Sequence, residues 1–395
     1  MKKIYLVTEY FHQNQNTTGY LFHKLFEHLK REYGSNLSLI VKEDKHNDVI
    51  DPNSIIVKDS TLNKKNLIQR LLFETIISFR FFIQIMKHVK KGEIVFTGTT
   101  PIFLLIVTYL AKKIIGFKWV LLVHDVFPEN LVAANVLKKQ NFFYKILKRV
   151  FDILYAAPEK LIVIGQDMKD LVDNKIDKNK SIIIQNWIDE NDIFIEKKQD
   201  NEILQTLGWQ NEGPVFQFFG NIGRVQGVDN ILEAINLIEA SRRPKFLFMG
   251  DGAYAYHLRD KLSAMNDPNI KYLGPIKQAD KSKGLNAGDI AIVTLADGML
   301  GLGVPSKAYF SMAADKPVLA IMDERSEVSS MVKEHNIGWV VPPMNPELLA
   351  EKILEIVSEW DVSTLSSSRD VLIKYYSEPV AMEKIVEVLN TVSSI

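Results

Sequence analysis

Short apolar runs alternate with amphipathic stretches along the whole chain. In the first half, the run Ile4 to Thr8 leads through a polar turn into apolar residues at helical spacing between Tyr20 and Tyr33. Later runs of strand length lie at Leu37 to Val41, Ile94 to Thr97, Trp119 to Val123 and Lys160 to Ile164. Strands that alternate with helices predict a doubly wound α/β sheet.

The alternation continues in the second half, after a segment beginning at Gln185. Strands are predicted at Val215 to Phe219, Lys245 to Met249 and Val318 to Met322, and two helices, Pro346 to Trp360 and Glu378 to Val392, close the chain. A chain of 395 residues is long enough for two domains with separate cores. The pattern therefore predicts two α/β domains.

Composition removes several classes of function. The chain has 48 basic and 48 acidic residues and no net charge, which argues against a general nucleic-acid binder. It has no cysteine, so disulfides, thiol catalysis and cysteine-based metal sites are excluded. Glu9 and His12 interrupt any signal-peptide core near the N-terminus, and we expect a cytoplasmic location.

Two glycine-rich loops follow predicted strands in the second half. Gly220-Asn221-Ile222-Gly223 continues to Gly227, and Gly250-Asp251-Gly252 follows the next strand. Glycines let a backbone approach a ligand closely. Neither loop spells G-x-G-x-x-G with an acidic residue about twenty positions on, so the pattern favours a nucleotide-sugar transferase over a dinucleotide dehydrogenase.

The segment Pro305-Ser306-Lys307 opens a predicted helix. It brings backbone N–H groups, a hydroxyl and an ammonium to the positive end of the peptide dipoles, which suits a diphosphate. The alternative interpretation of Lys307 is a solvated lysine at a helix start.

Together these segments resemble GT-B-fold glycosyltransferases of the retaining family 4, in the branch that includes colanic-acid and N-acetyl-fucosamine transferases. The resemblance also rests on Lys316 to Ala320, Ser326 to Val328 and Gly338 to Pro343. It implies two Rossmann-like domains facing a central cleft: an acceptor-binding domain over 1–185 and a nucleotide-sugar-binding domain over 186–375. It also implies that a terminal helix, 376–395, crosses back to the first domain.

The same resemblance implies the reaction. The chain is expected to move a hexosyl or N-acetylhexosaminyl group from a nucleoside diphosphate sugar, with UDP as the expected nucleotide. The acceptor is expected to be lipid-linked or a polysaccharide, in the synthesis of lipopolysaccharide or capsule, and the anomeric configuration is expected to be retained.

The chain departs from the family pattern at four positions. The usual Glu-x7-Glu pair falls on Leu302 and Phe310, and the usual diphosphate-binding cations fall on Asn221 and Gln226. These departures leave Lys307 and Arg224 as the local cations for the diphosphate. They also keep two alternatives open, a non-catalytic nucleotide-sugar-binding protein and a nucleotide-sugar 2-epimerase.

The predicted site has a donor side and an acceptor side. The expected donor contacts are Gly19, Gly220, Asn221, Gly223, Arg224, Gln226, Gly250, Asp251, Pro305, Ser306, Lys307 and Glu327. For Asp251 and Glu327 the alternatives are a turn at a strand end and compensation of a helix dipole.

His124 and Asp125 follow the strand Trp119 to Val123 and are the expected catalytic residues, together with Lys307. His124 is expected to bind the donor sugar, and Asp125 or Glu129 to orient the acceptor hydroxyl, with Thr18 on the acceptor side. The alternative for Asp125 and Glu129 is that they cap the helix that follows Pro128.

No Asp-x-Asp, H-x3-H or H-E-x-x-H pattern occurs, so we expect neither a metal nor another cofactor. Two segments, Asn63 to Lys91 and Lys138 to Arg149, mix basic residues with aromatic and aliphatic ones. Such helices lie on anionic membrane surfaces or pack on a core with a solvated basic face. We expect a peripheral location on the inner face of the cell membrane.

Overall fold

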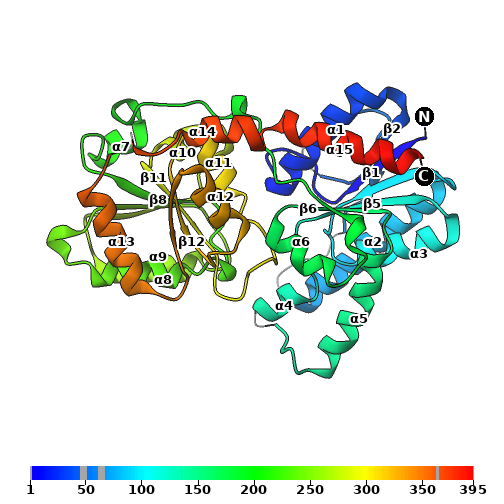
Figure 1. Ribbon diagram of the computed structural model, residues 1–395, viewed down its shortest axis with the longest axis horizontal. Coiled ribbons are helices and arrows are strands. Elements are labelled where there is room, and N and C mark those ends of the chain that lie inside the picture. Colours follow the sequence, from blue (N-terminus) through cyan, green and yellow to red (C-terminus); the bar gives the residue numbers. More distant parts are fainter. Residues whose placement is uncertain (1, 45–50, 61–66, 135, 362–363, 395) are drawn as a thin grey trace. The chain divides into compact units, whose positions relative to one another are not determined.

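The computed structural model describes residues 2–44, 51–60, 67–134, 136–361 and 364–394. They form two compact units (Figure 1). The first comprises Met1–Glu129, Lys138–Gln185 and Glu378–Ile395, and the second comprises Asn130–Leu137 and Asn186–Ser377. The first residues of the segment from Asn63, up to residue 66, lie outside the described residues.

The first unit is built on a parallel sheet in the order β3-β2-β1-β4-β5-β6-β7. Its strands are β1 (Ile4–Thr8), β2 (Leu37–Lys42), β3 (Ile55–Val57), β4 (Ile94–Thr97), β5 (Lys118–Val123), β6 (Lys160–Val163) and β7 (Ser181–Ile183). The predicted strands are confirmed, with β6 one residue shorter than expected. The edge strands β3 and β7 were not predicted.

The helices of the first unit cover both sides of this sheet, as a doubly wound topology requires. They are α1 (Thr17–Tyr33), α2 (Leu67–His88), α3 (Leu104–Ile115), α5 (Phe142–Ala156), α6 (Gln166–Asp173) and α15 (Glu378–Ser394), and α4 (Glu129–Ala133) begins where the unit is interrupted. The terminal helix α15 packs within this unit, where Lys118 Nζ donates to the Val392 carbonyl and Tyr33 donates to Asn390 Oδ1.

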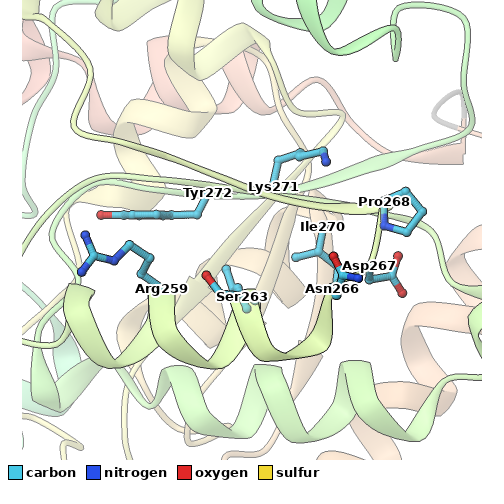
Figure 2. Close-up of a pocket in the computed structure, with 9 residues that line it drawn as sticks. Arg259, Ser263, Asn266, Asp267, Pro268, Ile270, Lys271 and Tyr272 are labelled. Carbon is cyan, nitrogen blue, oxygen red and sulfur yellow. The ribbon is translucent and has the colours of Figure 1, made fainter.

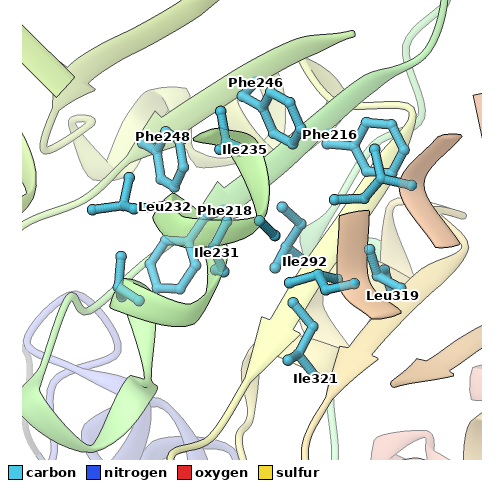
Figure 3. Packing of buried hydrophobic residues seen from close by; sticks show 14 of the residues in the cluster. Phe216, Phe218, Ile231, Leu232, Ile235, Phe246, Phe248, Ile292, Leu319 and Ile321 are labelled. Carbon is cyan, nitrogen blue, oxygen red and sulfur yellow. The ribbon is translucent and has the colours of Figure 1, made fainter. Parts of the chain in front are cut away.

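The second unit has a parallel sheet in the order β10-β9-β8-β11-β12-β13. Its strands are β8 (Val215–Phe219), β9 (Lys245–Met249), β10 (Ile270–Gly274), β11 (Ile290–Thr294), β12 (Val318–Ile321) and β13 (Gly338–Val341). Aromatic side chains pair across β8 and β9 in its core, with Phe216 5.5 Å from Phe246 and Phe218 6.3 Å from Phe248 between ring centroids (Figure 3).

The helices of the second unit are α7 (Glu202–Leu207), α8 (Val228–Leu237), α9 (Ala255–Met265), α10 (Lys281–Asn286), α11 (Lys307–Ala313), α12 (Glu327–His335), α13 (Pro346–Ser358) and α14 (Ser368–Val371). Because all strand pairs are parallel, the carboxyl ends of β8, β9, β11 and β12 meet at one edge of the sheet. The loops singled out in the second half of the sequence all begin at this edge.

Within the described residues, no helix has the length and apolar character needed to cross a lipid bilayer.

Candidate functional site

Main-chain hydrogen bonds join the two glycine-rich loops of the second unit. The Gly220 N–H donates to the Met249 carbonyl at 2.8 Å, and the Ile222 N–H donates to the Asp251 carbonyl at 2.9 Å. The Tyr254 N–H then donates to the Ile222 carbonyl at 3.0 Å. The loops therefore form one frame at the carboxyl edge of the sheet.

Only glycine fits this frame at position 250. Gly250 has a φ of +142°, and a Cβ there would lie 1.8 Å from the Gly220 carbonyl oxygen. Both the backbone angle and the contact exclude a side chain. Gly250 thus fixes how closely the two loops approach each other.

The side chain of Lys307 enters this frame from the first position of α11. Its ammonium donates to the Asn221 carbonyl at 2.7 Å and to Gln226 Oε1 at 2.6 Å. It also lies 3.8 Å from the centroid of the Phe218 ring. The missing side chain of Gly220 makes room, since a Cβ there would lie 3.3 Å from Lys307 Cε.

The Lys307 ammonium therefore lies against the two positions that lack the usual family cations. Burial lowers the pKa of Lys307 to about 7. An ammonium carries three donors, and its third has no partner among the described residues. The structure thus brings Gly220, Asn221, Gln226 and Lys307 together, which their spacing in the sequence could not show.

Arg224 provides a second cation in the same loop. It is exposed, and its guanidinium has no hydrogen-bond or ion-pair partner in the part of the chain that the structure describes. Asn221 is also exposed, and Gly223 precedes the short turn Arg224–Gln226 that leads into α8. These exposed polar groups are available to an anionic ligand.

The positions that usually carry the Glu-x7-Glu pair are apolar and buried. Leu302 is 5% exposed and Phe310 is 7% exposed. The Lys281 ammonium lies 3.2 Å from the centroid of the Phe310 ring, and burial lowers the pKa of Lys281 to about 7. At position 310 an aromatic ring that contacts a lysine thus stands where the family usually has a carboxylate.

The other predicted donor residues of the second unit lie at the same sheet edge. The Pro305 carbonyl accepts from the Ala308 N–H at 3.2 Å, and Ser306 immediately precedes α11. Asp251 is exposed, and its carboxylate accepts from the Gly252 N–H at 2.8 Å, which is the turn geometry foreseen as its alternative. Glu327 is the buried first residue of α12.

In the first unit, His124 and Asp125 follow β5. Their backbone N–H groups both lie 3.3 Å from Thr99 Oγ1, and Tyr155 donates to the Asp125 carbonyl at 3.1 Å. Burial lowers the pKa of His124 to about 4 and raises the pKa of Asp125 to about 6. Near pH 7 the imidazole is therefore neutral.

Both ring nitrogens of His124 are buried and have no hydrogen-bond partner among the described residues. The ring meets Phe22 edge-on, with 6.4 Å between the ring centroids. Burying an imidazole without hydrogen-bond partners costs free energy, so a polar group of a ligand that hydrogen-bonds His124 would bind favourably there.

The first turn of α1 contains Thr18 and Gly19. The Gly19 N–H donates to Asn16 Oδ1 at 2.8 Å, and a Cβ on Gly19 would lie 2.5 Å from the His12 carbonyl oxygen. The Gly19 amide is thus part of a helix cap, and a side chain at this position would collide with the backbone of His12. Contacts from Thr18 and Gly19 to substrate stay predictions.

Glu129 forms an ion pair that the sequence did not indicate. Its Oε1 accepts from the buried ammonium of Lys175, which also donates to Asp152 Oδ1 at 3.0 Å. Glu129 is the first residue of α4, which places its carboxylate in the first turn of that helix. The ion pair gives Glu129 a structural role beside its predicted acceptor contact.

A polar cluster next to the glycine loops was also missed. The Tyr254 hydroxyl donates to Asp229 Oδ2, and His257 Nε2 lies 3.1 Å from Asp229 Oδ1. The i, i+3 spacing of Tyr254 and His257 at the start of α9 was a signal for a shared face. Because Tyr254 also binds the Ile222 carbonyl, this cluster steadies the loop frame.

A groove of about 460 Å³ runs between α9 and the edge strand β10 (Figure 2). Arg259 and Tyr272 lie at one end, and Asn266, Asp267 and Pro268 at the other. Arg259 and Tyr272 also line a second cavity, of about 300 Å³, which Asp251 borders. The hollowed surface thus begins beside the predicted donor residue Asp251.

No group of three or more His, Asp or Glu side chains suited to a metal ion occurs in the described portion of the chain.

Sequence comparisons find relatives of this chain. The family described as "Glycosyl transferases group 1" matches residues 213–359, which include both glycine loops and Lys307. Over 390 residues the chain is 40% identical to "Probable glycosyltransferase WbjE" of Pseudomonas aeruginosa, and the match covers 97% of this chain and 96% of that protein.

Solved structures share the fold at low sequence identity. Sucrose-phosphate synthase from Thermosynechococcus elongatus is similar at a TM-score of 0.80 and 14% identity, with 100% of both chains covered. HepE from Anabaena in complex with UDP-glucose is similar at a TM-score of 0.72 and 14% identity, with 99% of this chain and 100% of that chain covered.

Proposed function

The chain belongs to the group 1 glycosyltransferases and has a GT-B fold, and from this premise we propose a particular transfer reaction. The donor is a nucleoside diphosphate sugar, with UDP as the nucleotide. The transferred group is a hexose or N-acetylhexosamine, and the acceptor is a lipid-linked or polysaccharide glycan. The resemblance to the colanic-acid branch of family 4 supports a product in a surface glycan such as lipopolysaccharide or capsule.

The observation that carries this proposal is the position of Lys307 Nζ inside the glycine loop. Its two acceptors, Asn221 and Gln226, occupy the positions where family members carry cations. One cation from α11 thereby takes the place of two from the loop. The third ammonium donor and the exposed guanidinium of Arg224 bind the diphosphate.

These contacts assist departure of the nucleotide. The bond between the anomeric carbon and the diphosphate oxygen breaks while the acceptor hydroxyl attacks from the same face. The hydroxyl proton passes to the departing phosphate, and the configuration is retained. Lys307 and Arg224 stabilise the negative charge that develops on the diphosphate, and no metal is needed for that task.

His124 and Asp125 serve the sugar and the acceptor. The unpartnered, neutral imidazole of His124 hydrogen-bonds a sugar hydroxyl, and the Asp125 carboxylate orients the acceptor hydroxyl. The enzyme acts in the cytoplasm on the inner face of the cell membrane, where lipid-linked acceptors are presented.

A second candidate is a non-catalytic protein that binds nucleotide sugar. Burial of Leu302 and Phe310, in place of the acidic pair, favours it. The 2-epimerase alternative is weakened by the same observation, because that chemistry needs carboxylates at the sugar.

One experiment separates these functions. The purified chain is titrated calorimetrically with UDP and GDP, and then incubated with a panel of UDP-sugars and a cell-derived lipid acceptor. Transfer of the sugar to lipid, detected by mass spectrometry, supports the proposal. Nucleotide binding without transfer to any acceptor supports the non-catalytic candidate, and an epimerised donor in the absence of acceptor supports the epimerase.

A further inference from the structure

Helix α5 presents an apolar stripe to solvent. Phe142 is 70% exposed and Phe143 is 66% exposed, and three more large apolar side chains of the helix are also exposed, namely Ile146, Val150 and Ile153. At about 100° per residue, these five positions fall within one sector of the helix surface. The stripe therefore runs along the whole helix on a single face.

The opposite face of the same helix is occupied by the core of the first unit. Tyr144, Phe151, Leu154 and Tyr155 are buried there. The exposed stripe is therefore additional to the packing face, and the alternative of an ordinary core-facing helix does not account for it. Soluble surfaces carry scattered apolar residues, whereas a continuous stripe of this kind marks an interaction site.

Unpaired cations border the stripe. Lys145 and Arg149 are exposed and have no ion-pair partner among the described residues, whereas Lys148 is paired with Asp152 at 2.7 Å. Lys138 and Lys139 precede the helix and are also exposed. Apolar side chains flanked by free cations complement a bilayer surface that contains anionic lipids.

The neighbouring helix α3 also exposes apolar side chains. Leu110 and Ile114 are exposed there, and Lys112 Nζ donates to the Ala157 carbonyl just after α5, at 2.6 Å. Between the two helices lies a groove of about 520 Å³, lined by Tyr109, Lys112, Lys113, Ile153, Ala156 and Ala157. The exposed ammonium of Lys113 gives this groove a cation for a lipid phosphate.

Helix α2 presents a smaller exposed apolar surface than α5, with Leu71, Leu72 and Phe79 exposed among its described side chains. Arg70 pairs with Glu74 at 3.1 Å, and Arg80 donates to the carbonyls of Lys58 and Asp59. Two of its cations are thus engaged within the protein. Lys87, Lys90 and Lys91 of the same segment are exposed and have no ion-pair partner among the described residues, so the segment containing α5 is distinguished by its larger apolar stripe.

We propose that the exposed face of α5, continued by Leu110, Ile114 and the groove beside Lys113, is a docking surface for an anionic bilayer. Phe142 and Phe143 enter the acyl boundary, and Lys145 and Arg149 contact lipid phosphates. The inference rests on the proposed function for its purpose, because docking there brings the enzyme to a lipid-linked acceptor.

The chain has no cysteine, which permits a direct test with single labels. Phe143→Cys and Leu237→Cys are each labelled with an environment-sensitive fluorophore and mixed with phosphatidylglycerol-containing or pure phosphatidylcholine vesicles. Leu237 is an exposed apolar residue of the second unit and is the matched control. A blue shift at position 143 alone, with anionic vesicles alone, is the expected result.

Flotation of unlabelled variants tests the energetic contribution. Phe142→Ser/Phe143→Ser is expected to lower partitioning into anionic vesicles at least about 10-fold, since two large apolar side chains leave the interface. Lys145→Glu/Arg149→Glu is expected to lower it similarly, and wild-type binding is expected to weaken in about 1 M salt. Leu237→Ser/Met344→Ser, which removes two exposed apolar residues elsewhere, should change nothing.

Equal shifts at positions 143 and 237, or equal binding to neutral vesicles, would overturn the proposal. Circular dichroism of each variant checks that it is folded. Donor binding, measured by calorimetry without lipid, is independent of this surface. If the wild-type chain binds UDP but does not bind anionic vesicles, only the docking surface is contradicted, and the reverse result contradicts only the proposed function.

Discussion

Lys307 Nζ donates a hydrogen bond to Gln226 Oε1 at 2.6 Å, across 81 positions of the sequence. Gln226 is unusual for the family when considered alone, since it replaces a cation in the glycine loop. Considered together, they show a cation supplied to that loop from a different element. Several predictions depend on this pairing or on the loop that it supports.

Lys307→Ala is expected to weaken UDP binding and to slow transfer while leaving the fold intact. Loss of a charge-assisted hydrogen bond to phosphate costs about 1.5–3 kcal/mol, or roughly a 10- to 100-fold rise in Kd. Calorimetry with UDP measures the change. Lys261→Ala, at an exposed position on α9, is the matched control, and unchanged affinity in Lys307→Ala would remove this lysine from the site.

The affinity for a UDP-sugar is expected to fall as the pH rises through about 7. Burial lowers the pKa of Lys307 to about 7 in the free protein, and a bound diphosphate raises it, so the protonated form binds more tightly. The dependence approaches tenfold per pH unit above the free pKa. Lys307→Arg stays charged and should give a flat profile, and an equally steep profile in that variant would assign the titration elsewhere.

Asp125→Asn is expected to stabilise the first unit at pH 8 and to reduce transfer. Burial raises the pKa of Asp125 from 3.8 to about 6, so the native state favours the protonated carboxyl. The stability that the protonated carboxyl contributes is fully present below pH 3.8 and is lost as the pH rises through about 6. At pH 8 the buried Asp125 carboxylate therefore lowers the free energy of unfolding by about 3 kcal/mol. Denaturant unfolding of the wild type and the variant, at pH 8 and below pH 3.8, measures this difference in the free energy of unfolding.

The control for this prediction is Glu32→Gln, because Glu32 is an exposed carboxylate of α1 in the same unit. It should not change the free energy of unfolding at either pH. A destabilised Asp125→Asn at pH 8 would show that the carboxylate has a stabilising partner in solution.

Gly250→Ala is expected to destabilise the second unit by at least about 2 kcal/mol and to abolish donor binding, because the new Cβ collides with the Gly220 carbonyl at positive φ. Thermal unfolding and UDP calorimetry measure the two effects. Gly213→Ala, where a Cβ meets nothing within 4 Å, provides the comparison. A folded Gly250→Ala with normal UDP affinity would separate the loop frame from the donor site.

EDTA is expected to leave the transfer rate unchanged, because the proposed mechanism assigns diphosphate neutralisation to Lys307 and Arg224. Rates are compared with and without chelator, and then after addition of Mg²⁺ or Mn²⁺. An absolute requirement for either ion would contradict the proposed mechanism.

Periodicity was sufficient for the long elements of the fold. β1 and β5 contain continuous apolar runs, the apolar run of β8 is interrupted only by Gln217, and α1 has a clear helical period, so their positions follow from the sequence. The strands β3 and β7 have only three residues each, too few to show a period, and they form only through pairing with neighbours already in place.

The candidate site was predictable only as a set of separate pieces. Glycine spacing indicated the loops at 220–227 and 250–252, and the Pro305-Ser306 step indicated the region of Lys307. Their assembly depends on the strand order, which places β8 beside both β9 and β11. The ion pair between Glu129 and Lys175 and the Tyr254–Asp229 contact are likewise side-chain contacts between distant positions.

The loop frame has a consequence for how this enzyme can be altered. Its two strand-end loops are joined by main-chain hydrogen bonds, from Gly220, Ile222 and Tyr254, rather than by the side chains of Asn221 and Arg224. The backbone of the loop therefore keeps its conformation when these two side chains are replaced. A combinatorial library at Asn221 and Arg224 should retain folding in most members while it varies the affinity for the diphosphate, which makes this loop a starting point for tuning donor affinity.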